Sequence, residues 1–473
     1  MNVPARPETG SRLPLLVFGG LLLLVAGVVL GAGAAAVGPW VVAGVLAAGF
    51  AVVFLLSSGR ALFLTVFVAK PFIDMLWFAK FGPESATLNA QSLVSIAVLM
   101  VALIIIVLRR VQLPSGLFVP MAAFVLVNAV AVMLTPSLPE GANVFLRIVC
   151  GFPLVFVVPV IMDELPGPRR LLQLFMVVIA AVYVTILLQP LGIIPYRSFE
   201  DSGLSRATGF YYHPWDVARY LVIAMPLLLA LLEERATRGA ERWAYRVLFA
   251  ATLVVTYVTF LKAAWIVVLL EIVVFYWLVG KHRRALLVFA VIALVVAFPA
   301  RQATFQTFSD LAKLGDPQHR GEALSGRVSL WSAEWASLEA ASPLELLIGQ
   351  GLSPTVLQET GAAPHNDFLR IVIMNGIIGL LAYASLILAA LHMLRKAVRR
   401  LARKRGIEWR IGVAVQCLFL AYLAMGLTAD PSSYPSITLY LWLLLGLVVG
   451  YAKQSMSAEA ALIAGTPDAR LMR

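Results

Sequence analysis

The chain has 473 residues, of which 61% are hydrophobic and 13% are charged, and its mean hydropathy is +0.90. Soluble domains average about 45–50% apolar and about 25% charged residues. The composition therefore excludes an ordinary soluble protein, a disordered chain, a disulfide scaffold and a collagen-like fibre. The net charge of +12 would indicate nucleic acid in a soluble protein, but in a membrane protein basic residues also record orientation.

Apolar segments of bilayer-spanning length follow one another along most of the chain. A membrane-spanning helix needs about 20 mostly apolar residues. The first segment is longer than the apolar core of a signal peptide, so we expect it to remain as an uncleaved helix. We predict an all-α polytopic membrane protein with about fourteen transmembrane helices, at 14–36, 39–56, 61–79, 91–108, 115–134, 143–161, 171–189, 214–232, 247–262, 265–280, 285–300, 366–393, 411–428 and 436–452.

Basic residues gather in alternate connections between these spans. One side holds the richest connection, with Arg395, Lys396, Arg399, Arg400, Arg403, Lys404, Arg405 and Arg410. The other side holds few basic residues, among them Lys80, Arg197, Arg206 and Lys262. Because Lys and Arg mark cytoplasmic loops, we predict an inner (plasma) membrane protein with both termini in the cytoplasm. The basic excess is then mostly a topology signal, and no nucleic acid partner is expected.

Two connections on the outer side are long, 190–213 and 301–364. Within the second, Val328, Trp331, Trp335 and Leu338 recur at helical spacing, which predicts an amphipathic helix at the outer membrane interface. The chain thus divides into an N-terminal bundle (1–189), central helices (190–300), a large periplasmic loop (301–364), C-terminal helices (365–453) and a cytoplasmic tail (454–473).

Ionisable residues inside spans are costly and few. Lys70 and Asp74 are four residues apart, so we expect them to pair on one helical face. Glu271 is expected to pair with a nearby cation. Cys150 and Cys417 fall inside spans and are interpreted as packing residues. No cluster has metal-ligand spacing, so no metal and no cofactor are predicted.

Several cations fall at the outer ends of the predicted spans. Any single one can be explained by its side chain reaching the lipid headgroups. For the set, a site for a large anion is an equally good interpretation, since Arg and Lys suit phosphate oxygens. The cations are Arg147, Arg206, Arg219, Lys262, Arg327 and Arg370.

Two histidines share this side, His213 and His365. His365 stands where the long loop meets the next span, and an imidazole transfers protons near neutral pH. From position alone, it is either a catalytic group or a helix-start residue that bonds nearby backbone.

The residues around His365 resemble a known family. His365-Asn366, nine residues, Gly376, two residues and Gly379 form a pattern that resembles the O-antigen ligases and related polymerases. The preceding segments 349–351, 325–331 and 206–214 also resemble that family. The resemblance covers roughly 200–450 and agrees with a many-span topology.

The resemblance implies transfer of glycan from undecaprenyl diphosphate at the outer face of the inner membrane, without metal or cofactor. It implies that His365 deprotonates or orients the acceptor hydroxyl. It also implies that Arg327 stabilises the diphosphate leaving group, with Arg206, Lys262, Arg370, Arg147 and Arg219 as candidate diphosphate ligands. Where the family usually has Ser-Arg-Gly-Ala, this chain has Leu261-Lys262-Ala263-Ala264, and Lys262 lacks the bidentate fork of arginine.

We therefore expect a glycosyltransferase that polymerises lipid-linked repeat units of an O-antigen or exopolysaccharide. The alternative is a ligase that moves the finished glycan to lipid A core or another acceptor. A transporter or flippase of the same lipid-linked glycan is less favoured, because we find no clear internal repeat and the cations lie at one end. A structural partner of other polysaccharide-assembly proteins would leave the outer cations unexplained.

Overall fold

The computed structural model describes residues 58–76, 80–81, 88–193, 200–201, 204–259, 261–297, 313–316, 319, 326–353 and 365–463. The predicted spans at 14–36 and 39–56 lie outside these residues. Within the described part, helices dominate and strands occur only as two short hairpins, which confirms the all-helical fold class. The hairpins pair β1 (Lys80–Phe81) with β2 (Leu88–Asn89), and β3 (Glu200–Asp201) with β4 (Leu204–Ser205).

Eight helical stretches of the described chain are long and apolar enough to cross a membrane. The eight are α5 (Ala90–Leu108), α6 (Ser115–Met133), the run Leu138–Val160, α9 (Pro168–Leu187), α10 (Pro214–Leu232), α18 (Asp367–Leu401), α19 (Ile407–Gly426) and α20 (Pro435–Ile463). The run Leu138–Val160 contains α7 (Leu138–Val149), α8 (Leu154–Val157) and the 3₁₀ turn η3 (Val158–Val160). All eight match predicted spans.

The other four predicted spans are helical where the structure describes them. One is interrupted, two are shorter, and the fourth is 20 residues long but begins with a charged turn. Segment 61–79 is a broken helix made of α3 (Gly59–Leu64), the π-helical η1 (Thr65–Ala69) and α4 (Lys70–Met75). The segments at 247–262, 265–280 and 285–300 correspond to α11 (Gly239–Val258), α12 (Lys262–Leu278) and α13 (His282–Ala297). The total of fourteen spans therefore stays a prediction.

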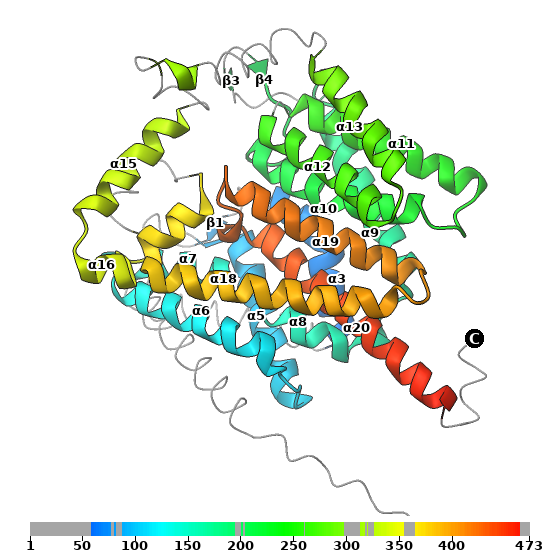
Figure 1. Cartoon of the computed structure of the whole chain (residues 1–473), viewed down its shortest axis with the longest axis horizontal. Helices are drawn as coiled ribbons and strands as arrows, with labels where there is room; N and C mark the ends of the chain where they lie inside the picture. Colours follow the sequence, from blue (N-terminus) through cyan, green and yellow to red (C-terminus); the bar gives the residue numbers. More distant parts are fainter. Residues whose placement is uncertain are drawn as a thin grey trace, which may run out of the picture.

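The helices pack around α20, whose apolar stretch is 89% buried (Figure 1). On one side α18 packs against α6 and α19, and on the other α10 packs against α19, α12, α11 and α9. Aromatic rings join η1, α9 and α20. The ring centroids of Phe67 and Phe175 are 4.9 Å apart, and those of Phe175 and Tyr440 are 5.5 Å apart. Aromatic pairs at these separations stabilise beyond the burial of their area.

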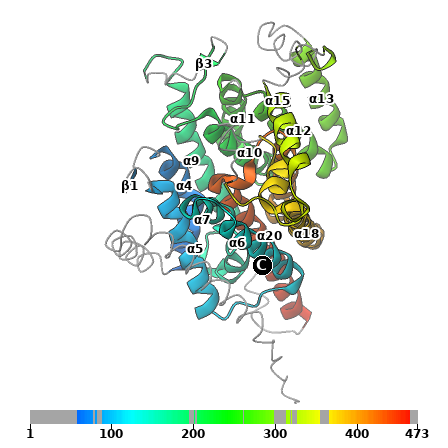
Figure 2. The ribbon, with the colours of Figure 1, turned by 90° about the vertical axis from the view of Figure 1, so that its left-hand side faces the viewer.

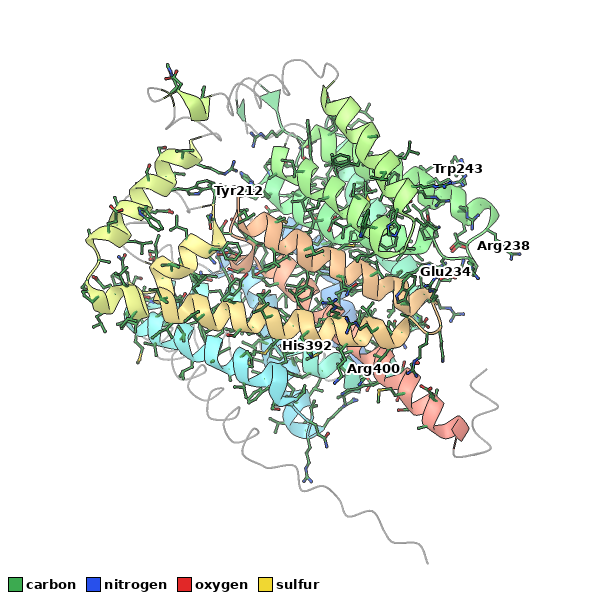
Figure 3. The ribbon with its side chains drawn as sticks, viewed as in Figure 1. Tyr212, Glu234, Arg238, Trp243, His392 and Arg400 are labelled. Carbon is green, nitrogen blue, oxygen red and sulfur yellow. The ribbon has the colours of Figure 1, made fainter. Side chains whose placement is uncertain are left out.

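The long helices share two ends. Ion pairs fix one of them: Arg410 at the start of α19 lies 2.7 Å from Glu234 just after α10, and Arg109 after α5 lies 2.5 Å from Glu164. Figure 3 shows Glu234 and Arg238 at the opposite end of the helices from Tyr212. The end with Glu234, Arg238 and the C-terminal part of α18 is called the Arg400 end. The end with Tyr212 and the start of α18 is called the His365 end. The predicted topology places the Arg400 end in the cytoplasm.

Short elements cover the His365 end (Figure 2). A helix is present at the predicted place in the long loop, as α15 (Arg327–Ala340), and α16 (Pro343–Ile348) follows it. That α15 is amphipathic and lies at the membrane interface stays a prediction. Leu338 is buried on α15 whereas Trp335 is exposed, so this helix has an inner and an outer face. The other short elements are η5 (Lys313–Gly315) and η7 (Pro431–Ser433), whereas η4 (Met162–Glu164) carries Glu164 and lies at the Arg400 end.

Candidate functional site

The His-Asn pair forms the start of α18. Asn366 is the N-cap: its side-chain oxygen accepts a hydrogen bond from the Leu369 N–H at 3.0 Å, which is the bond that a helix start requires. The Asn366 amide also donates to the Leu427 carbonyl at 3.4 Å, beyond the end of α19. His365 has a φ of 50°, a conformation uncommon for a residue with a side chain. Asn366 therefore fixes the helix start, and the half-buried His365 precedes it.

A buried polar network lies one turn into α18. The Asp367 carboxylate accepts hydrogen bonds from the Ser432 N–H at 3.0 Å and the Ser432 hydroxyl at 2.7 Å. The Arg370 guanidinium donates to the same hydroxyl at 2.7 Å, and lies 3.5 Å from Asp367 and 3.8 Å from Asp430. The structure thus joins Arg370, one of the predicted anion-binding residues, to two carboxylates of this end of the molecule.

The start of α10 supplies a second group of site residues. His213 is its N-cap and forms a capping box with Asp216. Arg219, one turn further on, lies 2.7 Å from Asp216, and its guanidinium carbon is 3.3 Å from the centroid of the Tyr434 ring. A guanidinium over an aromatic face is attracted by the ring quadrupole. Arg219 is therefore held between a carboxylate and an aromatic ring.

Glycine residues of the family-like pattern shape the loop that faces this network. α18 is interrupted at Gly376, where φ is 66° and ψ is −170°. The carbonyls of Ile373 and Met374 accept hydrogen bonds from the backbone N–H groups of Gln350 at 2.9 Å and Gly351 at 3.2 Å. The break in α18 therefore supplies carbonyl groups that the preceding loop binds, and the loop is attached to the helix backbone to backbone.

Two glycines allow this close approach. A Cβ added to Gly376 would overlap the carbonyl of Leu347, and one added to Gly349 would overlap the carbonyl of Met374. Gly349 also has a φ of 85°, which favours glycine. We call this contact between 347–351 and 373–376 the glycine contact. It anchors α16, and through α16 the preceding α15, to the helix that begins next to His365.

Arg327 is the first residue of α15, directly after Gly326 with a φ of 78°. Burial lowers the pKa of the half-buried Arg327, and the nearby Arg206 guanidinium lowers that pKa further. Burial also lowers the pKa of His365; the Asp430 carboxylate raises it, and Arg327 lowers it. Residues far apart in the sequence, Arg206, Arg327, His365 and Asp430, thus share one electrostatic environment.

His213 belongs to the same environment. Its pKa is lowered to about 4 by burial and by the positive charges of Arg219 and Arg206, with a contribution from His365. Its imidazole is therefore neutral near pH 7. Burial is the main cause of this lowered pKa; the nearby charges of Arg219 and Arg206 add to it and have the sign that favours a bound anion.

For the other two predicted cations, Arg147 and Lys262, the structure shows fewer contacts. Arg147 on α7 donates from Nε to the Asn143 side chain at 3.2 Å, and its charge interacts with those of Arg219 and Arg370. Lys262 is the first residue of α12; its side chain lies outside the described part of the structure.

Sequence reasoning missed the connection between α19 and α20. Asp430, Ser432 and Tyr434 in this connection contact the start of α18 and the side chain of Arg219. The available signal was the polar run 430–434 between two apolar spans. Glu334 was missed as well: it is buried on α15, and neither of its carboxylate oxygens has a hydrogen-bond partner among the residues that the structure describes. Burial raises its pKa to about 7.

The predicted pairing of Lys70 with Asp74 is confirmed, whereas Glu271 has no partner among the described residues. Lys70 and Asp74 form a buried ion pair, to which the Tyr220 hydroxyl adds a hydrogen bond at 2.5 Å. Glu271 is also buried, but among the described residues no cation or hydrogen-bond donor contacts its carboxylate oxygens. Cys150 and Cys417 are buried and free, as packing residues should be.

An all-helical chain with eight apolar helices of spanning length, and with cations and histidines gathered at one helix end, is an integral membrane protein. Residues 247–384 match the family model described as O-antigen ligase. The resemblance to the O-antigen ligase and polymerase superfamily is thereby confirmed over this segment, which contains His365, Arg327 and the glycine contact. A search of curated proteins found no match.

Proposed function

We propose that this chain is an inner-membrane glycosyltransferase that uses undecaprenyl-diphosphate-linked oligosaccharide at the periplasmic face and polymerises repeat units of an O-antigen or exopolysaccharide. The observation that supports it most directly is the shared electrostatic environment of Arg206, Arg327 and His365, of which the last two lie in the segment that matches the O-antigen ligase family. Charge of this kind suits the diphosphate of a lipid-linked donor.

In the proposed reaction, His365 is the general base. Because burial and Arg327 lower its pKa, the imidazole is neutral near pH 7 and accepts a proton from the acceptor hydroxyl. The acceptor oxygen bonds to the anomeric carbon of the donor sugar while the bond from that carbon to the diphosphate oxygen breaks. Undecaprenyl diphosphate leaves, and the proton stays on His365 until solvent removes it. A positioned base contributes about 10²–10⁴-fold to such a step.

Arg327 and Arg206 stabilise the negative charge that grows on the leaving diphosphate, and we assign Lys262 to the same role, although it stands where the family pattern has arginine. Preorganised cations of this type need no metal to act on a phosphate leaving group. Arg370, Arg219 and Arg147 contact carboxylate, aromatic and amide groups of the protein. We assign these three to positioning the site and to its long-range field.

A ligase that transfers the finished glycan to lipid A core or another acceptor is the second candidate, because the matched family model is named for ligases. The choice of polymerase depends on the predicted fourteen spans. Both candidates use the same donor and the same leaving group, so they differ only in the acceptor.

The test replaces His365→Ala and Arg327→Ala, one at a time, in cells that lack the chromosomal copy. His392→Ala is the matched control, since His392 lies on the same helix toward the Arg400 end (Figure 3). We expect loss of full-length surface glycan in the first two variants and normal glycan in the control. Full-length glycan in either site variant, at normal protein level, would contradict its catalytic role.

The material that accumulates without the protein separates the two candidates. Single repeat units on the final acceptor indicate a lost polymerase. Long lipid-linked chains beside a bare acceptor indicate a lost ligase.

A further inference from the structure

A cavity of about 340 Å³ lies at the Arg400 end, away from the site described above. It is enclosed by the residues just before α6, by α8 and η3, and by the C-terminal parts of α18 and α20. Its floor is apolar and buried, formed by Val155, Phe156, Ala397 and Ala452. The volume is within the range of about 300–1,000 Å³ typical of small-molecule sites.

Three basic side chains line the rim of this cavity: Lys396 and Arg400 of α18, and Lys453 of α20. Lys396 and Arg400 are four residues apart and so lie on one face of α18. All three are exposed. No acidic side chain among the described residues lies within ion-pair distance of any of them. We call the cavity with its rim the basic groove.

The apolar cavity sets the three rim cations apart from the others of this end. Arg395, Arg399 and Lys404 also have no ion pair among the described residues, but they do not line this cavity, and further cations of this end are paired. Arg403 lies 3.1 Å from Glu459, Arg410 lies 2.7 Å from Glu234, and Lys281 is paired with Glu233. A general excess of basic residues at a cytoplasmic end follows from topology alone. Topology does not require three unpaired cations around an apolar cavity, so this arrangement calls for a ligand with both negative charge and an apolar part.

We propose that the basic groove binds an anionic phospholipid of the adjacent leaflet, with its headgroup phosphate between Lys396, Arg400 and Lys453 and its acyl chains along the apolar floor. The cytoplasmic leaflet is rich in anionic lipids, and basic pockets between transmembrane helices bind their headgroups. A free phosphate or nucleotide would match the rim and leave the floor without a partner. A zwitterionic lipid would match the floor and leave the net positive charge of the rim unbalanced.

Such a lipid would contact α18 and α20 together. α18 also begins next to His365 at the other end of the molecule, and α20 is the central helix of the bundle. A ligand that binds only the folded arrangement stabilises it in proportion to its occupancy. The bound lipid would therefore hold α18 in place from the end opposite the site. This inference does not depend on the glycosyltransferase assignment.

The test uses the full-length protein in a neutral detergent. Its thermal unfolding midpoint and its lipid binding are measured with phosphatidylglycerol, with phosphatidylcholine and with inorganic phosphate. The groove variant carries K396Q, R400Q and K453Q. The matched control carries R395Q, R399Q and K404Q, which removes the same charge from the same end outside the groove.

We expect phosphatidylglycerol alone to raise the midpoint of the wild type, the groove variant to bind it at least about tenfold more weakly, and the control variant to bind it as the wild type does. Equal losses in both variants would overturn the proposal in favour of a diffuse basic surface. An equal shift with phosphate would show a free-anion site, and an equal shift with phosphatidylcholine would show apolar contact only; either result also overturns it.

Discussion

The two ends of the helical bundle use arginine in different ways. At the His365 end, the side chains of Arg370 and Arg219 are 5% and 7% exposed and contact carboxylates, a serine and a tyrosine ring. At the Arg400 end, those of Arg403 and Arg284 are 75% and 58% exposed. An exposed arginine costs the fold little, whereas a buried one must be matched by partners. The charge rule that sets membrane orientation therefore explains the second group and leaves the first to be explained by the site.

Burial alone does not define a site. Arg410 and Glu234 form a buried pair at the Arg400 end, with side chains 9% and 13% exposed. This pair joins α19 to α10, and among the described residues no histidine or tyrosine hydrogen-bonds to it or stacks on it. The His365 end differs because its buried cations share one environment with two histidines. The combination, and not the ion pair by itself, marks the candidate site.

Among the substitutions that test this difference between the two ends, Gly376→Ala should lower the stability of the fold most. A side chain at a φ of 66° is strained, and its Cβ would overlap the Leu347 carbonyl in the glycine contact. Strain and overlap together should cost about 4 kcal/mol in the free energy of unfolding. We expect a lower unfolding midpoint in detergent and loss of glycan assembly in cells.

Gly116→Ala is the matched control for this prediction. Gly116 lies in α6 with nothing near its would-be Cβ, so alanine should be neutral or slightly stabilising. If Gly376→Ala unfolds like this control, the glycine contact does not hold the loop, and the His365 end is not assembled in the way described.

Substituting Arg370→Gln tests the pairing within the His365 end. It leaves Asp367 and Asp430 buried without their shared cation, which should cost about 3 kcal/mol. The double variant Arg370→Gln with Asp367→Asn removes one of the two carboxylates and should regain part of that loss. Chemical unfolding of the two variants measures the difference. Identical stabilities would mean that Arg370 and Asp367 are not energetically coupled.

Much of the fold could be predicted from the sequence, because a local run of apolar residues is enough to identify a bilayer-spanning helix. The predicted span 214–232 coincides with α10, and 411–428 differs from α19 by a few residues at each end. The boundaries near α11 were wrong because the charged start of that helix continues the helical conformation past its apolar part.

The candidate site could be predicted only in part. His365 and the cations were selected because they lie at the outer ends of predicted spans and because a family pattern surrounds His365. The contacts of Asp430 with Arg370, and of Gln350 with Ile373, join segments that no local period connects. The role of Gly376 was hidden as well, since a glycine inside an apolar span does not reveal that the helix breaks there and that its free carbonyls bind a preceding loop.

Substituting Glu334→Gln tests a buried carboxyl of the His365 end that has no hydrogen-bond partner in the described part of the chain. Burial raises its pKa to about 7, above the ordinary value of 4.5. The folded state therefore keeps a proton that the unfolded chain releases, and stability falls as pH rises from about 4.5 to about 7. Glutamine does not ionise. The variant should be more stable than the wild type by about 1–3 kcal/mol at pH 8 and nearly equal to it at pH 5.

Unfolding curves at the two pH values measure this difference. Glu339→Gln is the control, because Glu339 is exposed on the same helix and its substitution should leave the pH dependence unchanged. A Glu334→Gln effect of the same size at pH 5 and pH 8 would mean that the carboxyl is not ionised by the rise in pH.

Substituting Arg403→Ala should have the smallest effect. Arg403 and Glu459 lie 3.1 Å apart, but their side chains are 75% and 57% exposed, and exposed ion pairs contribute about 0–1 kcal/mol. We expect a loss below about 0.5 kcal/mol that disappears at high salt, because screening acts on exposed pairs first. Unfolding in low and high salt measures it. A loss approaching that of Arg370→Gln would mean that exposed pairs support the fold as strongly as buried ones, and the contrast between the two ends would then have to come from ligand binding and not from the stability of the fold.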